Sequence, residues 1–159
     1  MISITLITLG TLKEDYLRAA VKEYLKRLST LAQVSEVNLA EERIPNEDDA
    51  ASVSRALERE GDAILARIPK GAVTVALCVE GKELSSEALA AYIGEAGDRC
   101  GKLCFIIGSS HGLSPRVKAA ADLRLSFSRL TFPHQLMRVM MTEVLYRSMT
   151  ILAGKRYHK

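Results

Sequence analysis

Three short stretches of the chain combine residue types that could do chemistry. Residues 108–112, GSSHG, follow an apolar run, and glycines at this spacing let a backbone approach a ligand closely. His134 is followed one helical turn later by Arg138, so an imidazole and a guanidinium share one side of a helix. The tail contains Tyr157 and His158, an aromatic platform and a second imidazole. Simpler interpretations stay open for each stretch: a plain tight turn, a histidine that bonds its own loop and an anchored tail.

The glycine turn matches none of the common phosphate-binding motifs. No Gly-Lys-Ser/Thr follows it as in a Walker motif, and the pattern GxGxxG is not present. The chain has no GxSxG elbow, no HExxH and no pair of acids at a spacing typical of a catalytic site. Nothing in the sequence therefore supports a hydrolase or a metalloenzyme. The cysteines Cys78, Cys100 and Cys104 are odd in number and are interpreted as free thiols in a reducing compartment. We expect no metal site.

Charge is distributed unevenly over the 159 residues, whose net charge is +3. After Pro115 the chain carries nine Lys and Arg residues against two acids, so the part before it is net acidic. A basic C-terminal third favours a surface that meets a polyanion such as RNA, although arginines that merely solvate a helix give the same pattern. No apolar run is long enough to span a membrane, and the first ten residues lack a basic leader, so we expect a cytoplasmic protein.

Strand-like and helix-like patterns alternate from end to end and predict a single α/β domain, residues 1–159. Two continuous apolar runs, 72–79 and 103–107, are typical of strands buried on both faces. We therefore expect a mostly parallel sheet with helices on both faces. Ligands bind such sheets at the carboxyl ends of the strands. The stretches expected to meet there are 77–81, 108–112 and 127–133.

Local signals give expected element boundaries. The apolar run 72–79 should end at a turn over residues 80–82, and a helix should follow from Ser85 to about Gly97. An earlier helix is expected to be capped by Asn46, with Asp49 three residues on.

The C-terminal helix is the element around which the chain is organised. It is predicted to begin at Pro133, with Thr131 as its cap, and to run to Leu152 without an interior glycine or proline. Its apolar residues cover most of the circumference, so nearly every side of it should be buried. A chain of this length has little interior to spare. We therefore expect a second copy to cover one side of the helix, giving a homodimer, while a central core helix is the simpler alternative.

Several stretches, taken in order, resemble one known family. They are LCVEGK at 77–82, FIIGSSHGL at 105–113, LSFSRLTFPHQLMRVMMTEVLYR at 125–147 and the terminal Tyr157-His158. Together they are similar to the RlmH family of ribosomal RNA methyltransferases, which belongs to the SPOUT class. The similarity runs along the whole chain, and the stretch from Leu125 is its most specific part. One residue departs from the family pattern: Ser109 stands where the family usually has a second glycine.

The resemblance implies a fold and a cofactor that composition and spacing do not give. SPOUT proteins tie the C-terminal part of the chain into a deep trefoil knot and form homodimers. In the family, S-adenosylmethionine sits in the knot. The matching contact positions in this chain are Leu77, Gly108, Phe127, Ser128, Arg129, Leu130, Thr131 and Phe132.

The family reaction, methylation of N3 of a pseudouridine in 23S ribosomal RNA, implies roles for four further residues. His134 and His158 are the candidates for the base that removes the N3 proton. Tyr157 would stack on the target base or anchor the tail, and Arg138 would face a substrate phosphate or the pseudouracil carbonyls. Because so small a protein has little surface for recognising RNA sequence, we expect the substrate to be the assembled ribosome.

Two rival functions stay open. A non-catalytic ribosome-binding or RNA-binding module could keep the same fold without turnover, and Ser109 is the residue that favours it. A nucleotide-binding regulator would use residues 108–112 to hold nucleoside phosphates instead.

Overall fold

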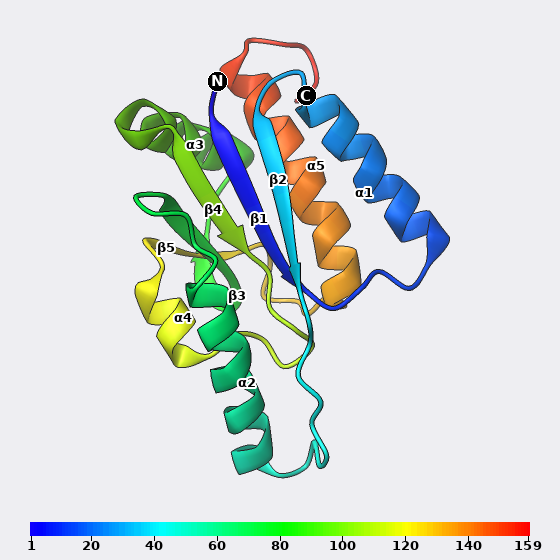
Figure 1. Cartoon of the computed structure of the whole chain (residues 1–159). Helices are drawn as coiled ribbons and strands as arrows, with labels where there is room; N and C mark the ends of the chain where they lie inside the picture. The colour runs from blue at the N-terminus through cyan, green and yellow to red at the C-terminus, as the bar shows by residue number, and fades with distance from the viewer.

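Five parallel strands form one sheet in the order β2-β1-β4-β3-β5 in a computed structural model, which describes residues 1–159 (Figure 1). The strands are β1 Ser3–Leu9, β2 Gln33–Leu39, β3 Val73–Glu83, β4 Lys102–Ile106 and β5 Leu123–Ser126. The helices are α1 Asp15–Leu28, α2 Ala50–Leu65, α3 Ser86–Cys100, α4 Pro115–Ala120 and α5 His134–Leu152. Each strand is followed by a helix, so the predicted α/β class with a parallel sheet is confirmed.

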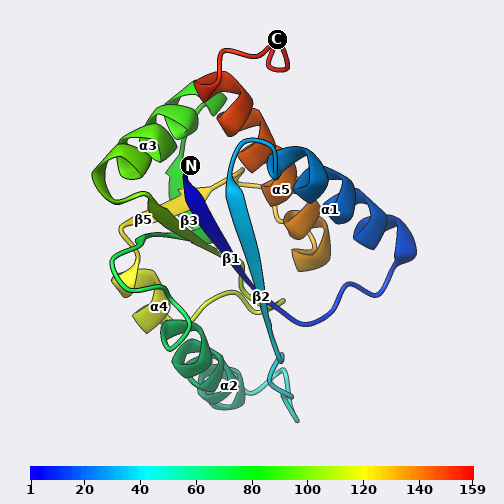
Figure 2. The same cartoon turned by 45° about the horizontal axis from the view of Figure 1, so that its top comes forward.

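Helices cover both faces of the sheet (Figure 1 and Figure 2). On one face, Leu28 of α1, Ile93 of α3 and Met141 of α5 belong to one apolar cluster. On the other face, Ile64 of α2 and Val117 of α4 belong to a second cluster. Strands β1, β3 and β4 supply side chains to both clusters, which explains why their sequences are apolar almost without interruption.

Strand β3 is longer than its apolar run predicts. It continues through residues 80–82, where the sequence predicts a turn, and its pairing with β5 is restored beyond them. Leu77 and Lys82 both pair with Leu125, so residues 78–81 are extra residues on the β3 side of the ladder. The predicted turn is therefore wrong. These extra residues stand at the carboxyl end of the sheet, where a ligand is expected.

Two helix boundaries differ from their sequence signals. The cap of α2 is Asp49, whose carboxylate accepts two backbone hydrogen bonds from the first turn, whereas Asn46 accepts from a backbone N–H two residues on, before the helix. Helix α3 has its predicted N-cap but runs past Gly97 and ends at Gly101, which has a left-handed backbone conformation.

Helix α5 lies on one face of the sheet between α1 and α3 (Figure 2). Pro133 occupies its cap position and no side chain caps it, so the prediction of Thr131 as the cap is wrong. The helix is also less buried than its composition predicts, because Leu136 is 38% exposed, and Met140 and Ile151 on the same side are only partly buried. One side of α5 therefore packs in the core of the chain, and the other remains open.

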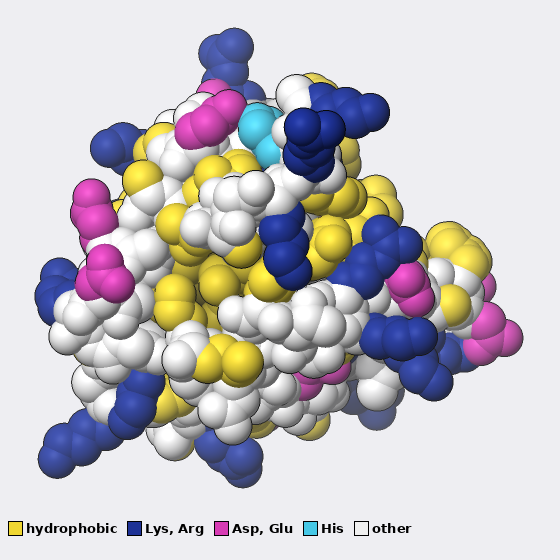
Figure 3. Space-filling view, turned by 90° about the horizontal axis from the view of Figure 1, so that it is seen from above, with side chains coloured by type: hydrophobic (Ala, Val, Ile, Leu, Met, Phe, Trp, Pro, Cys, Tyr) yellow, Lys and Arg dark blue, Asp and Glu magenta, His cyan; other side chains and the backbone are white.

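Both termini lie at the amino ends of the strands (Figure 1). Seen from that end, apolar side chains occupy the middle of the molecule, and charged side chains project around them (Figure 3). None of the helices combines the length and the apolar composition needed to cross a membrane. The trefoil knot that the resemblance implies stays a prediction.

Candidate functional site

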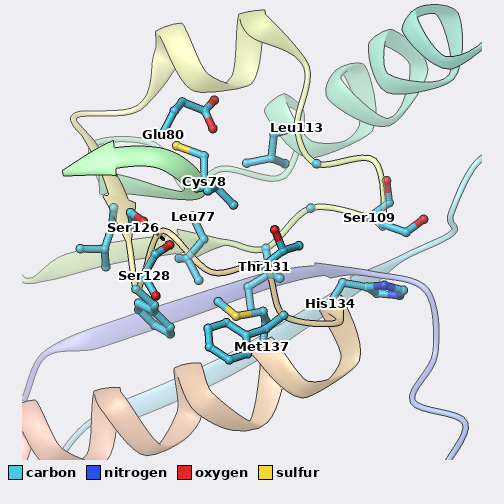
Figure 4. Close-up of a pocket in the computed structure, with 18 of the residues that line it drawn as sticks. Leu77, Cys78, Glu80, Ser109, Leu113, Ser126, Ser128, Thr131, His134 and Met137 are labelled. Carbon is cyan, nitrogen blue, oxygen red and sulfur yellow. Dashed lines mark hydrogen bonds between the residues drawn. The ribbon is translucent and has the colours of Figure 1, made fainter. Parts of the chain in front are cut away.

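A cavity of about 320 Å³, here called the strand-end cavity, lies at the carboxyl ends of β3, β4 and β5. The three stretches expected to meet at this edge of the sheet all contribute to its walls. Figure 4 shows Leu77, Ser128 and Thr131 around it, with His134 at its edge. The predicted cofactor contacts that line it are Leu77, Gly108, Phe127, Ser128, Leu130, Thr131 and Phe132. Arg129 is the only predicted cofactor contact that does not line it.

The glycine turn closes one side of the strand-end cavity. A Cβ on Gly108 would lie 2.3 Å from the carbonyl oxygen of Gly112, so a side chain cannot be accommodated at that position. The Gly112 N–H donates to the Ser109 carbonyl at 2.9 Å, which tightens the turn. No residue other than glycine has a positive φ, so Ser109 fits the position of the family's second glycine without backbone strain.

Ser109 contacts a buried carboxylate that no sequence motif marks. Its Oγ donates to Oε1 of Glu60 at 2.9 Å, and the Glu42 N–H donates to Oε2 of Glu60 at 2.9 Å. Glu60 is only 3% exposed, and this burial raises the pKa of its carboxyl despite the two hydrogen bonds. The signal that could have found Glu60 is its position four residues before Ile64, on the buried stripe of α2.

The extra residues of β3 bring Cys78 and Glu80 to the strand-end cavity. Gly81 allows this path, because a Cβ there would lie 2.8 Å from the backbone of β5. Glu80 forms an ion pair with Lys118 of α4, and that hydrogen bond lowers the pKa of the Glu80 carboxyl. Burial raises the pKa of the Cys78 thiol. The structure contains no group of three or more His, Cys, Asp or Glu side chains that could hold a metal ion.

The segment between β5 and α5 is held by its own serines. Ser126 Oγ donates to the Ser128 carbonyl at 3.0 Å, and Ser128 Oγ accepts from the Leu130 N–H at 3.0 Å. These bonds shape the loop that carries most of the predicted cofactor contacts. Leu130 itself is 70% exposed, so the loop presents an apolar side chain that the rest of the chain leaves uncovered.

Arg138 lies apart from the strand-end cavity, although His134, one turn earlier on α5, lines that cavity. The Arg138 side chain points toward the end of β1, where Nη1 donates to the Gly10 carbonyl at 3.0 Å. Arg138 is 7% exposed, and burial lowers the pKa of its guanidinium. It lines a second cavity, which lies beside α1 and β2.

Tyr157 and His158 fold back beside the C-terminal half of α5, against residues 143–147. The Tyr157 hydroxyl donates to Oε1 of Glu143 at 3.0 Å, and His158 Nε2 lies 2.8 Å from Oε1 of Glu87. Burial raises the pKa of Tyr157 to about 12. Glu143, which Tyr157 contacts, lies nine residues after His134, about 14 Å along the helix axis. A single chain therefore brings only His134, of the four predicted catalytic residues, to the strand-end cavity.

Comparison with known proteins gives matches along nearly the whole chain. The family model described as "Predicted SPOUT methyltransferase" matches residues 2–158. A ribosomal RNA large subunit methyltransferase H of Bifidobacterium animalis is 45% identical over 158 residues, which cover 99% of each chain. The corresponding protein of Carboxydothermus hydrogenoformans is 43% identical over 157 residues, 98% of this chain and 99% of the relative. A putative methyltransferase H of Methanococcus maripaludis is 42% identical over 159 residues, 99% of each chain.

The matches and the geometry point in one direction. Strand-end loops surround a cavity in a parallel α/β sheet, and the family model covers all but the terminal residues. The chain therefore belongs to the SPOUT methyltransferase family.

Proposed function

We propose that this protein uses S-adenosylmethionine to methylate N3 of a pseudouridine in 23S ribosomal RNA. The observation that carries the proposal is the strand-end cavity, which is lined by every predicted cofactor contact except Arg129. The names of the relatives, which assign them to large-subunit ribosomal RNA, support the substrate class.

The residues around the strand-end cavity suit this methyl donor. Leu77, Leu130 and Phe132 offer apolar surfaces to an adenine ring. Gly108 keeps one wall free of a Cβ, so backbone groups can approach the ligand. Loop N–H and C=O groups that become covered need hydrogen-bond partners, which the edge of an adenine can supply. The volume of about 320 Å³ is in the range of small-molecule sites.

The chemical task of the chain is positioning and proton removal. When bound, S-adenosylmethionine supplies a methyl group on a positively charged sulfur, which needs no further activation. The strand-end loops would position the acceptor nitrogen against that methyl group. His134 lines the cavity, where its imidazole would accept the N3 proton while the methyl group passes from sulfur to N3 and the donor leaves as the neutral thioether.

The target nucleotide leaves its stack to enter the site, as bases do when enzymes act on them. Arg138, one turn beyond His134, contacts the RNA beside the strand-end cavity. The substrate is the assembled ribosome in the cytoplasm, because a chain of 159 residues offers little surface for recognising RNA sequence.

The proposed active form is a homodimer paired through the open side of α5. Leu136 is exposed there, and Met140 and Ile151, on the same side of the helix, are only partly buried. A second copy would remove this apolar surface from water. Twofold pairing of α5 would also offer Tyr157 and His158 a route to the strand-end cavity of the partner.

A transfer assay tests the proposal. Ribosomes that lack the modification are incubated with the protein and with S-adenosylmethionine labelled in its methyl group. We expect label in 23S ribosomal RNA and, by mass analysis of digested RNA, at N3 of a pseudouridine. Label on another RNA or on another atom would contradict the proposal.

A non-catalytic RNA-binding module with the same fold is the second candidate. The observation that favours it is the position of the tail, which holds Tyr157 and His158 away from the strand-end cavity of their own chain. The same assay separates the two functions, because a binding module would retain ribosomes on a filter but transfer no label.

A further inference from the structure

A second cavity, of about 600 Å³, lies beside the strand-end cavity and is rich in positive charge. It is bounded by α1, the end of β1, β2 and α5. Four cationic side chains line it, and Glu36 is the only acid among its lining residues. We call it the basic cleft, defined by Arg18, Lys22, Lys26 and Arg138.

Arg138 is the buried member of the basic cleft. It is 7% exposed, yet it has no carboxylate within ion-pair distance, and its hydrogen bond goes to the Gly10 carbonyl. Desolvation lowers the pKa of its guanidinium, while Glu36 acts weakly in the opposite direction. A buried cation without a paired anion is costly, and an anion that enters the cleft would offset that cost.

The lysines of the basic cleft are likewise free of ion pairs. Lys22 and Lys26 are four residues apart on α1, so they project from the same side of the helix, and both are exposed. Arg18 has a structural task, because it pairs with Asp15 and donates to the Leu12 and Lys13 carbonyls. The exposed Lys22 and Lys26 and the buried Arg138 therefore remain available to a ligand.

The basic cleft and the strand-end cavity are joined through the first turns of α5. His134 lines the cavity and Arg138 lines the cleft, about 6 Å farther along the helix axis. The loop between β1 and α1 is tied to the same turn, because the Lys13 N–H donates to the Gln135 side chain at 3.2 Å. A polyanion with one residue in the cavity would pass directly over the cleft.

We propose that the basic cleft binds the sugar-phosphate backbone of RNA next to the nucleotide that is methylated. The inference rests on the proposed function, which supplies the RNA. Phosphate oxygens would accept from the Arg138 guanidinium and from the Lys22 and Lys26 ammonium groups. The cleft adds affinity and orientation, whereas the strand-end cavity selects the base.

The salt dependence of RNA binding tests this inference. The double variant Lys22→Gln/Lys26→Gln and the wild type are titrated with ribosomes that lack the methyl group, at several salt concentrations. Each lost phosphate contact on single-stranded RNA lowers the slope of log K against log salt by about 0.7, so we expect a decrease of about 1.4. The affinity for S-adenosylmethionine should not change.

The matched control is Lys70→Gln/Lys102→Gln, which removes the same charge from two exposed lysines at the amino ends of β3 and β4. An equal slope change in the control, or an unchanged slope in the cleft variant, would overturn the inference. An unchanged slope accompanied by a shift toward monomer in light scattering would assign the cleft to a second copy instead. If the wild type binds ribosomes with a cleft-dependent slope but transfers no methyl group, the proposed function fails while the cleft assignment stands.

Discussion

Glu60 accepts a hydrogen bond from Ser109, with 2.9 Å between Oε1 and Oγ, and both residues are buried. The bond links α2 to the glycine turn that forms one side of the strand-end cavity. Ser109, at the position of the family's second glycine, therefore has a hydrogen-bond partner. Glu60, which does not line the cavity, fixes the glycine turn through this bond.

Replacing Ser109 with Ala should destabilise the protein. The change leaves one oxygen of a buried carboxylate without its donor, which costs about 1–3 kcal/mol. Urea unfolding at neutral pH measures the loss. Ser110→Ala is the control, because Ser110 is exposed and makes only long contacts, 3.4 Å to Glu41 and 3.3 Å to His111. Equal stability of the two variants would mean that the bond from Ser109 contributes nothing.

Glu60 should make the protein less stable as the pH rises. Burial raises its pKa in the folded chain above the ordinary value of 4.5, so the folded state holds the proton more tightly than the unfolded state. The favourable contribution is complete below 4.5 and is lost as the pH rises through the folded pKa. The unfolding free energy of the wild type minus that of Glu60→Gln should therefore fall across this window. A difference that rises with pH would mean that the hydrogen bonds outweigh burial.

Replacing Gly108 with Ala should weaken binding of the methyl donor at least about tenfold, which corresponds to about 1.4 kcal/mol. The new Cβ would stand 2.3 Å from a backbone oxygen, so the turn must move and the cavity wall with it. Calorimetric titration with S-adenosylmethionine measures the effect. Gly94→Ala is the matched control, since the nearest atom there is the flexible end of Leu152. Unchanged affinity in Gly108→Ala would place the ligand elsewhere.

His134 should control the rate of methylation and not the affinity for the methyl donor. Removing a general base lowers kcat by about 100-fold to 10,000-fold, and we expect His134→Gln to fall in this range. His111→Gln is the control, because His111 also lines the strand-end cavity but belongs to the glycine turn. Transfer to ribosomes under saturating substrate measures kcat. If His111→Gln lowers kcat and His134→Gln does not, the general base is His111 and the assignment to His134 is wrong.

Arg138 should act on RNA alone. Lysine keeps the charge but loses the planar fork that binds a phosphate through two hydrogen bonds, so Arg138→Lys should lower kcat/KM for the ribosome about tenfold. Affinity for S-adenosylmethionine should stay nearly intact, because Arg138 does not line the strand-end cavity. Arg99→Lys on α3 is an exposed control. A large loss of methyl-donor binding would refute this role.

Periodicity and apolar runs predicted the fold class because a strand that is buried on both faces has an apolar sequence. The runs 72–79 and 103–107 are apolar because both faces of β3 and β4 are covered by helices. The extension of β3 has no apolar run that would have predicted it. It depends on pairing with β5, about 40 residues away in sequence, and Gly81 indicates a turn when its neighbours are unknown.

The candidate site was predictable where a loop carries a specific sequence pattern. It was not predictable where a charged side chain is buried, because charged residues are usually exposed. The resemblance gave the strand-end contacts, and only Arg129 lies outside the cavity they form. Glu60 was missed because an acid on an acidic helix is expected to face solvent, although its spacing places it on the buried stripe. The basic cleft was missed because it joins Lys22 and Lys26 to a residue on α5 that is more than 100 positions away.

Binding of S-adenosylmethionine to the purified protein tests the central claim most directly. Thermal or urea unfolding is followed with and without this ligand. A ligand present at 100 times its Kd should raise the unfolding free energy by about 2.7 kcal/mol, and Gly108→Ala should reduce that gain. No stabilisation of the wild type at any soluble concentration would contradict the assignment of the strand-end cavity to a methyl donor.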